Sequence, residues 1–279
     1  MTDQAWYESL DGTRVSMFII HRKDLPRDGH RPVRLSGYGG FNISVEPRFS
    51  ALHAAWLKVG GVLAFANVRG GGEYGRGWHE AACKTRRQNA FDDYIAAARW
   101  LVSAGYTTPS RLASRGNSNG GLLVAVTAMQ APEAFGAVYC RAPNLDMLCF
   151  PKFGSMSSAT SEYGSPDDPV EGAYLAGYSP YHNVKADRRY PVMTFVSALN
   201  DRIAPPYDPL KMVARLQAEV RQGGPYLLLP LRASGHGGGT TLTALIEQDI
   251  DELSFYCWAL DVAPSSPGEA FGAPLEDAQ

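Results

Sequence analysis

The sequence lacks any hydrophobic run of about 18 residues, the length that a membrane-spanning helix needs. Its first residues, MTDQAWYESLDGT, are polar and acidic and lack the apolar segment of a signal peptide. Basic residues are not in excess, since the formal net charge is -2, and no block of lysine or arginine indicates a nucleic acid or a membrane surface as a partner. We therefore expect a cytoplasmic protein that binds neither.

Cysteine is also scarce, and the cysteines are scattered along the chain. The four of them, Cys83, Cys140, Cys149 and Cys257, form no C-x-x-C pair. The sequence therefore predicts reduced thiols, no metal site and no cofactor. The composition is otherwise that of a globular protein, because 45% hydrophobic and 19% charged residues suffice for a full core.

Segments typical of strands and of helices alternate along the chain. This order predicts an α/β fold with a mostly parallel sheet and helices on both of its faces. We expect one domain over residues 1–262 and a flexible tail, rich in proline, glycine and acidic residues, over 263–279. A long loop region is expected over 144–180. The expected strands are 14–23, 31–40, 60–75, 110–116, 135–143, 190–201 and 226–232, and the expected helices are 89–105, 121–130, 209–220 and 241–260.

One short motif carries the clearest chemical signal. Gly116, Ser118 and Gly120 spell G-x-S-x-G between an expected strand and an apolar helix. This is the setting of a nucleophile elbow, in which a tight turn projects a serine hydroxyl from the end of the sheet. The helix that follows offers free N–H groups and a partial positive charge to a developing oxyanion.

A serine hydroxyl is a weak nucleophile until a base removes its proton. Among the six histidines, His236 stands in the glycine-rich loop RASGHGGGT, after the last expected strand and before the last helix. That position fits the chain order serine, acid, histidine of hydrolases with this elbow. Asp201 follows the expected strand 190–201 and is the candidate carboxylate that orients the histidine. The alternative is that Asp201 only begins a turn before Pro205.

The chain resembles the catalytic domain of the prolyl oligopeptidase family. The segments that carry this resemblance are SGYGGFNIS (36–44), ANVRGGGEYGRGWH (66–79), NAFDDYIAAARWL (89–101), GNSNGGLLVA (116–125), YSPYHNV (178–184) and SGHGGG (234–239). The resemblance implies an α/β-hydrolase fold and places the nucleophile, acid and base at Ser118, Asp201 and His236. It implies an oxyanion hole made by the Tyr38 hydroxyl and the backbone N–H of Asn119.

The chain also departs from the family pattern in three ways. A β-propeller usually precedes the catalytic domain, whereas here the matching region begins almost at Met1, which leaves open a natural absence or a fragment. Ala159 stands where family prolyl peptidases stack a tryptophan on the substrate proline, although Phe41 and Tyr163 would still line the pocket. The family's arginine two residues after the aspartate is replaced by Ile203, with Arg202 one position away. An alignment anchored on that arginine would instead place Asn200 at the acid position.

The sequence therefore predicts a serine hydrolase that cleaves small carboxylic esters, and short peptides as a further substrate class, through an acyl-enzyme on Ser118. One alternative is a proline-specific serine oligopeptidase, because both reactions use the same catalytic groups. Another is a catalytically silent binding domain, because fold alone does not decide function. Self-association into a homo-oligomer is an open expectation for a face that a propeller would otherwise cover.

Overall fold

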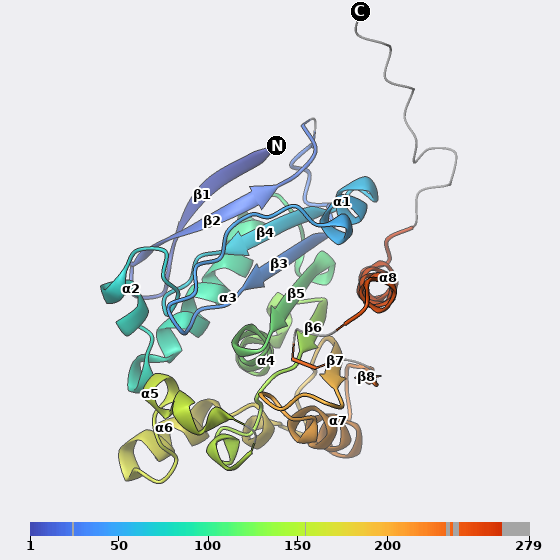
Figure 1. Cartoon of the computed structure of the whole chain (residues 1–279). Coiled ribbons are helices and arrows are strands. Elements are labelled where there is room, and N and C mark those ends of the chain that lie inside the picture. The colour runs from blue at the N-terminus through green and yellow to red at the C-terminus, as the bar shows by residue number, and fades with distance from the viewer. Residues whose placement is uncertain (24, 154, 233–234, 237–239, 264–279) are drawn as a thin grey trace, which may run out of the picture.

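The computed structural model of the chain describes residues 1–263 except 24, 154, 233–234 and 237–239. Eight strands of these described residues form one sheet in the order β1-β2-β4-β3-β5-β6-β7-β8 (Figure 1). Strand β2 is antiparallel to β1 and β4, and the remaining neighbours are parallel, which confirms the predicted mostly parallel sheet. The strands are β1 Thr2–Glu8, β2 Arg14–Ile20, β3 Val33–Gly37, β4 Val62–Ala66, β5 Leu112–Asn117, β6 Ala137–Arg141, β7 Val192–Ala198 and β8 Tyr226–Leu231.

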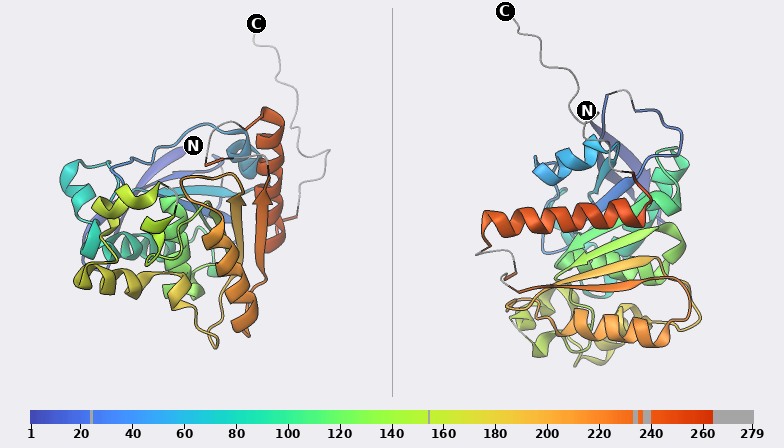
Figure 2. Two further views of the ribbon diagram at one scale, coloured as in Figure 1. Left: turned by 60° about the horizontal axis from the view of Figure 1, so that its bottom comes forward. Right: turned by 90° about the vertical axis from the view of Figure 1, so that its right-hand side faces the viewer.

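Helices cover both faces of the sheet, as predicted. Figure 2 shows α7 and α8 on opposite sides of it. Helix α8 shares its face with α1, and their core contains Trp56, Phe255 and Tyr256. Helices α3, α4 and α7 enclose the larger core, which contains Tyr94 and Leu122. These helices are α1 Ala51–Lys58, α3 Gln88–Ser103, α4 Asn119–Gln130, α7 Tyr207–Glu219 and α8 Leu242–Ala259.

Helix α3 illustrates how the sequence pattern sets the packing. Its buried residues recur at helical spacing and include Phe91, Tyr94 and Leu101, so one side of the helix faces the sheet. The helix ends before Gly105, which has a φ of +75° and donates its N–H to the carbonyl of Val102. Glycine adopts this left-handed conformation without a steric penalty, which explains why the helix ends here.

Two parts of the chain differ from the expectation. The segment 144–180, expected as a loop, contains the short helix α5 (Thr160–Tyr163) and the helix α6 (Pro169–Tyr178). Asp168 caps α6 by accepting hydrogen bonds from the first N–H groups, and Pro169 occupies the first helical turn, where proline is tolerated. Two glycines inside α6 weaken its helical pattern, which explains the wrong expectation. The edge strand β1 was also missed, because it is mostly exposed and polar.

Within the described residues, no helix has both the length and the apolar character needed to cross a membrane. All four cysteines are free thiols, as the scattered pattern predicted. The tail expected over 263–279 lies, from residue 264 onward, outside the described residues.

Candidate active site

Ser118 lies at the carboxyl end of β5, directly before α4, in a strained backbone conformation. Its φ is +57° and its ψ is -119°, a region that few residues other than glycine adopt. A Cβ at Gly116 would lie 1.8 Å from the carbonyl oxygen of Gly120, and one at Gly120 would lie 2.7 Å from the carbonyl oxygen of Gly37. Both motif glycines are therefore required by close backbone contacts, and the turn has the form of a nucleophile elbow.

Three predicted residues meet at this turn, although they come from distant parts of the chain. Nε2 of His236 lies 3.0 Å from Oγ of Ser118, and Nδ1 of His236 lies 2.6 Å from Oδ2 of Asp201. The order serine, histidine, aspartate is the arrangement that activates a hydroxyl for acyl transfer. A proton on Nδ1, facing the carboxylate, leaves the Nε2 lone pair free to accept the serine proton.

Asp201 is buried and rigidly held. Its other oxygen, Oδ1, accepts hydrogen bonds from the backbone N–H groups of Ile203 at 2.8 Å and Ala204 at 2.9 Å. Burial by itself would raise the pKa of Asp201, but the hydrogen bonds from His236, Ala204 and Ile203 outweigh it and lower the pKa below its ordinary value. The carboxylate is therefore ionised at neutral pH. Asp201 does begin a turn, and it also contacts the histidine, so the two interpretations of this residue are compatible.

Two groups expected to donate hydrogen bonds lie beside Ser118. The backbone N–H of Asn119 belongs to the first turn of α4, where N–H groups have no partner within the helix. The side chain of Tyr38 lies close to that of Ser118. Burial raises the pKa of Tyr38, and the nearby side chain of Ser118 opposes this effect only in part, so the phenol stays protonated as a donor.

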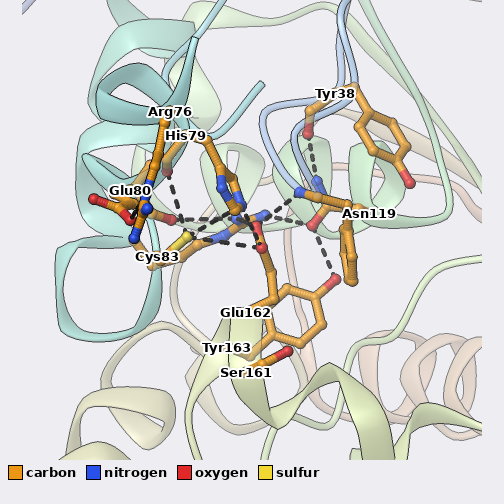
Figure 3. A network of polar contacts seen from close by, with 12 residues as sticks. Tyr38, Arg76, His79, Glu80, Cys83, Asn119, Ser161, Glu162 and Tyr163 are labelled. Carbon is orange, nitrogen blue, oxygen red and sulfur yellow. Dashed lines mark hydrogen bonds and ion pairs between the residues drawn. The ribbon is translucent and has the colours of Figure 1, made fainter. Parts of the chain in front are cut away.

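The side chain of Asn119 connects this region to the surrounding structure. Its Nδ2 donates to the carbonyl of Tyr38 at 2.6 Å, and its Oδ1 accepts from the Tyr163 hydroxyl at 2.9 Å and from the guanidinium of Arg87. Figure 3 shows Asn119 between the two tyrosines. The side chain therefore fixes the backbone that carries Tyr38, a role that the sequence motif did not indicate.

Arg87 and Glu162 extend this support beneath the Tyr38 loop. Arg87 is fully buried, and its Nη1 lies 3.2 Å from Oε1 of Glu162. The same oxygen accepts a 2.8 Å hydrogen bond from the backbone N–H of Phe41. The sequence did not indicate either residue. Arg87 stands in the basic, polar segment KTRRQN, and Glu162 lies 75 positions away, so no local pattern links them.

Two of the residues expected in a substrate pocket, Phe41 and Tyr163, lie together. The ring of Phe41 meets the buried ring of Tyr163 edge to face, with 5.5 Å between centroids, and Phe150 meets its other side at 5.4 Å. Phe41 is 36% exposed and so remains available to a ligand. Ala159 is buried at the start of α5, one turn before Tyr163, where it belongs to the hydrophobic core.

The two residues after Asp201 take different positions. Arg202 is exposed, and its carbonyl accepts a hydrogen bond from Ser155. Ile203 is 42% exposed and contributes its backbone N–H to Asp201. Of these two residues, Ile203 is therefore the one that helps to hold the acid in place.

A cavity of about 330 Å³ adjoins the elbow on the side of α8. Tyr38 and Asn117, the neighbours of the nucleophile, line part of it. The charged side chains of Arg34, Arg115 and Glu252 line its floor, and Glu252 lies within 3.4 Å of both arginines. The cavity is therefore polar and charged, unlike an apolar slot for a proline ring.

Comparison with known proteins agrees with this geometry. A family model described as the prolyl oligopeptidase family matches residues 47–263. The prolyl endopeptidase of Elizabethkingia miricola is 39% identical over 264 residues, which cover 94% of this chain and 37% of that protein. A solved prolyl endopeptidase structure is 45% identical, with a TM-score of 0.93, over 94% of this chain and 39% of that chain. The structure of prolyl oligopeptidase B from Galerina marginata is 36% identical, with a TM-score of 0.91, over 94% of this chain and 38% of that chain.

The chain thus spans somewhat more than a third of the length of the relatives that it matches. The family model's match contains Ser118, Asp201 and His236 and the five strands from β4 to β8. From the fold, the arrangement around Ser118 and these similarities together, we conclude that the chain has the α/β-hydrolase fold and belongs to the prolyl oligopeptidase family.

Proposed function

We propose that the protein is a serine hydrolase that cleaves short peptides and small carboxylic esters through an acyl-enzyme on Ser118. The observation that carries this proposal is the 3.0 Å contact between Oγ of Ser118 and Nε2 of a histidine that is itself held by a buried carboxylate. Nucleophile, base and orienting acid are therefore in hydrogen-bond contact before any substrate binds.

In the first half of the reaction, Oγ of Ser118 attacks the substrate carbonyl carbon while Nε2 of His236 takes the hydroxyl proton. The carbonyl oxygen becomes negative and accepts hydrogen bonds from the N–H of Asn119 and the hydroxyl of Tyr38. The imidazolium, stabilised by Asp201, then gives its proton to the departing amine or alcohol. In the second half, water replaces the leaving group and the same proton transfers release the acid and restore Ser118.

The substrate class rests on the pocket and on the relatives. The names of similar proteins, among them prolyl endopeptidase and prolyl oligopeptidase A, support peptides as substrates and favour proline specificity as the second candidate. Ala159 in place of a flat aromatic wall, and the exposed Phe41, support a weaker preference for proline. Small esters are proposed as substrates because their cleavage depends less than peptide cleavage on stacking against an aromatic wall.

The test of the proposal is the turnover of a peptide amide and of a small ester by the purified chain and by Ser118→Ala. Removing the serine from a serine–histidine–aspartate triad lowers kcat by a factor on the order of 10⁴ or more, and we expect a loss of this size in Ser118→Ala. Retention of more than about a hundredth of the wild-type turnover by a folded Ser118→Ala protein would show that another group is the nucleophile.

A further inference from the structure

Three different metal-ligating side chains converge beside the Tyr38 loop, away from the reacting serine. His79 lies in the last turn of α2 (Arg76–Glu80), Cys83 follows four residues later, and Glu162 comes from α5. Nε2 of His79 is 2.8 Å from Oε2 of Glu162, and Sγ of Cys83 is 3.3 Å from Nε2 and 3.7 Å from Oε2. The mutual approach of these three atoms is visible in Figure 3.

These separations are close to those around a tetrahedral zinc ion. With Zn–N and Zn–O bonds of about 2.0 Å and a Zn–S bond of about 2.3 Å, the nitrogen and oxygen lie roughly 3.3 Å apart and the sulfur roughly 3.6 Å from each. The observed contacts, 2.8, 3.3 and 3.7 Å, differ from these values by about half an ångström or less. Small side-chain movements would therefore admit an ion.

The carboxylate is already held in the manner of a metal ligand. Oε1 of Glu162 accepts hydrogen bonds from the backbone N–H of Phe41 at 2.8 Å and from Arg87 at 3.2 Å. These bonds orient the side chain and leave Oε2 directed at His79 and Cys83. Hydrogen bonds to the outer oxygen of a ligating carboxylate are the usual support of a metal site.

The site is also accessible. The side chain of His79 is 25% exposed, whereas that of Glu162 is 5% exposed, so the cluster opens towards solvent on the histidine side. An ion can enter from there, and water can complete its coordination. One nitrogen, one thiolate and one carboxylate form a ligand set suited to Zn²⁺, whereas Mg²⁺ and Ca²⁺ require oxygen ligands.

We propose that His79, Cys83 and Glu162 form a binding site for a single Zn²⁺ ion or a similar thiophilic divalent cation. The thiol proton leaves to solvent when the sulfur binds the ion. The sequence did not indicate this site, because its third ligand lies 79 positions after Cys83 and no C-x-x-C pair is involved. Glu162 belongs to this site and also supports the Tyr38 loop. The proposal does not rest on the hydrolase function proposed above.

Cobalt is the probe of choice, because Co²⁺ occupies zinc sites and a thiolate ligand gives it an intense charge-transfer band. The purified 279-residue chain is titrated with CoCl₂ under reducing conditions. The proposal predicts one equivalent of bound Co²⁺ with this band, no band in Cys83→Ser, and an affinity at least about tenfold lower in His79→Gln. The matched control Cys257→Ser, at a thiol on α8, should keep both the band and the affinity.

Competition identifies the class of ion. Zn²⁺ should abolish the band by displacing Co²⁺, because zinc binds such ligands more tightly, and millimolar Mg²⁺ should leave it unchanged. Circular dichroism of each variant establishes that it is folded. Absence of the band from the wild-type chain, its persistence in folded Cys83→Ser, or displacement of Co²⁺ by Mg²⁺ would each overturn the proposal, and the cluster would then be only an ion pair beside a free thiol.

Discussion

Asn119 holds Tyr38 in place through its side chain, which donates a 2.6 Å hydrogen bond to the Tyr38 carbonyl. The same residue offers its backbone N–H at the start of α4, beside Ser118. One residue therefore places its backbone N–H beside Ser118 and fixes the backbone of the loop that carries Tyr38.

Tyr38→Phe removes one donor and keeps the ring. We expect kcat to fall by roughly 10²–10³, the cost of losing one oxyanion-hole donor. KM should change little, because this hydrogen bond strengthens mainly in the transition state. Steady-state kinetics on a peptide amide measures both. The control Tyr74→Phe removes a hydroxyl bonded to Ser16, away from the site, and should leave kcat unchanged. A folded Tyr38→Phe protein with normal kcat would assign Tyr38 a purely structural role.

Asp201→Asn replaces the orienting carboxylate with a group of nearly the same shape. We expect kcat to fall by about 10⁴, because the amide favours the wrong histidine tautomer. The matched control is Asp11→Asn: a hydrogen bond from Arg69 lowers the pKa of Asp11 to about 2, yet Asp11 lies outside the site. Asp11→Asn should keep its kcat, and a similar loss in both variants would contradict the assignment of Asp201.

The same substitution has a signature in the pH dependence of stability. The pKa of Asp201 is lower in the folded protein than its ordinary value, so the carboxylate contributes stability above its unfolded value of about 3.9. This contribution is lost as the pH falls through the folded value. The difference in unfolding free energy between wild type and Asp201→Asn should therefore shrink between about pH 5 and pH 3. Denaturant titrations at several pH values measure it, and a difference that grows towards acid would contradict the assigned shift.

Arg87→Met should destabilise the fold and loosen the active site together. The substitution leaves Glu162 without its buried partner, a change that typically costs about 3–5 kcal/mol, and it removes one of the hydrogen bonds that hold the side chain of Asn119. Arg87→Lys should recover only part of the loss, because one ammonium does not reproduce the fork that reaches both partners. Chemical denaturation and kcat are the measurements. Arg76→Ala, which breaks an exposed ion pair with Glu80, serves as the control and should change neither.

The preference for proline over alanine tests the proposed role of Ala159 in the substrate pocket. Between two peptide amides that differ only in proline or alanine before the scissile bond, we expect a ratio of kcat/KM below about 100, which corresponds to roughly 2.7 kcal/mol. Ala159→Trp should raise this ratio if the indole turns towards Phe41. Because Ala159 is buried, overpacking should cost about 1–3 kcal/mol of stability, which denaturation measures. A wild-type ratio above 100 would instead indicate a proline-specific peptidase.

The sequence predicted the elbow and its partners because local constraints define them. Gly116 and Gly120 belong to one five-residue motif, and His236 lies in a recognisable glycine-rich loop. The alternation of apolar strands and amphipathic helices likewise predicted the parallel sheet and most of its helices. These features appear in the sequence as a periodic pattern or a short motif, so they can be predicted without a structure.

The remaining features depend on contacts between distant segments. Arg87 is a buried ion-pair partner only because α5 brings Glu162 against it, and an arginine in the basic segment KTRRQN looks exposed in the sequence. Helix α6 begins with a clear cap at Asp168, yet its glycines conceal the helical pattern. The contact between Cys83 and Glu162 likewise arises from tertiary packing.

The most direct measurement is covalent labelling of the purified chain by a fluorophosphonate probe, followed by mass mapping of the labelled peptide. Such a probe reacts with a serine hydroxyl that a neighbouring base activates. We predict one label on the peptide that contains Ser118, no label in Ser118→Ala and much slower labelling in His236→Ala. A folded wild-type chain that takes up no label, or a Ser118→Ala protein labelled as fast as wild type, would contradict the assignment of Ser118 as the nucleophile.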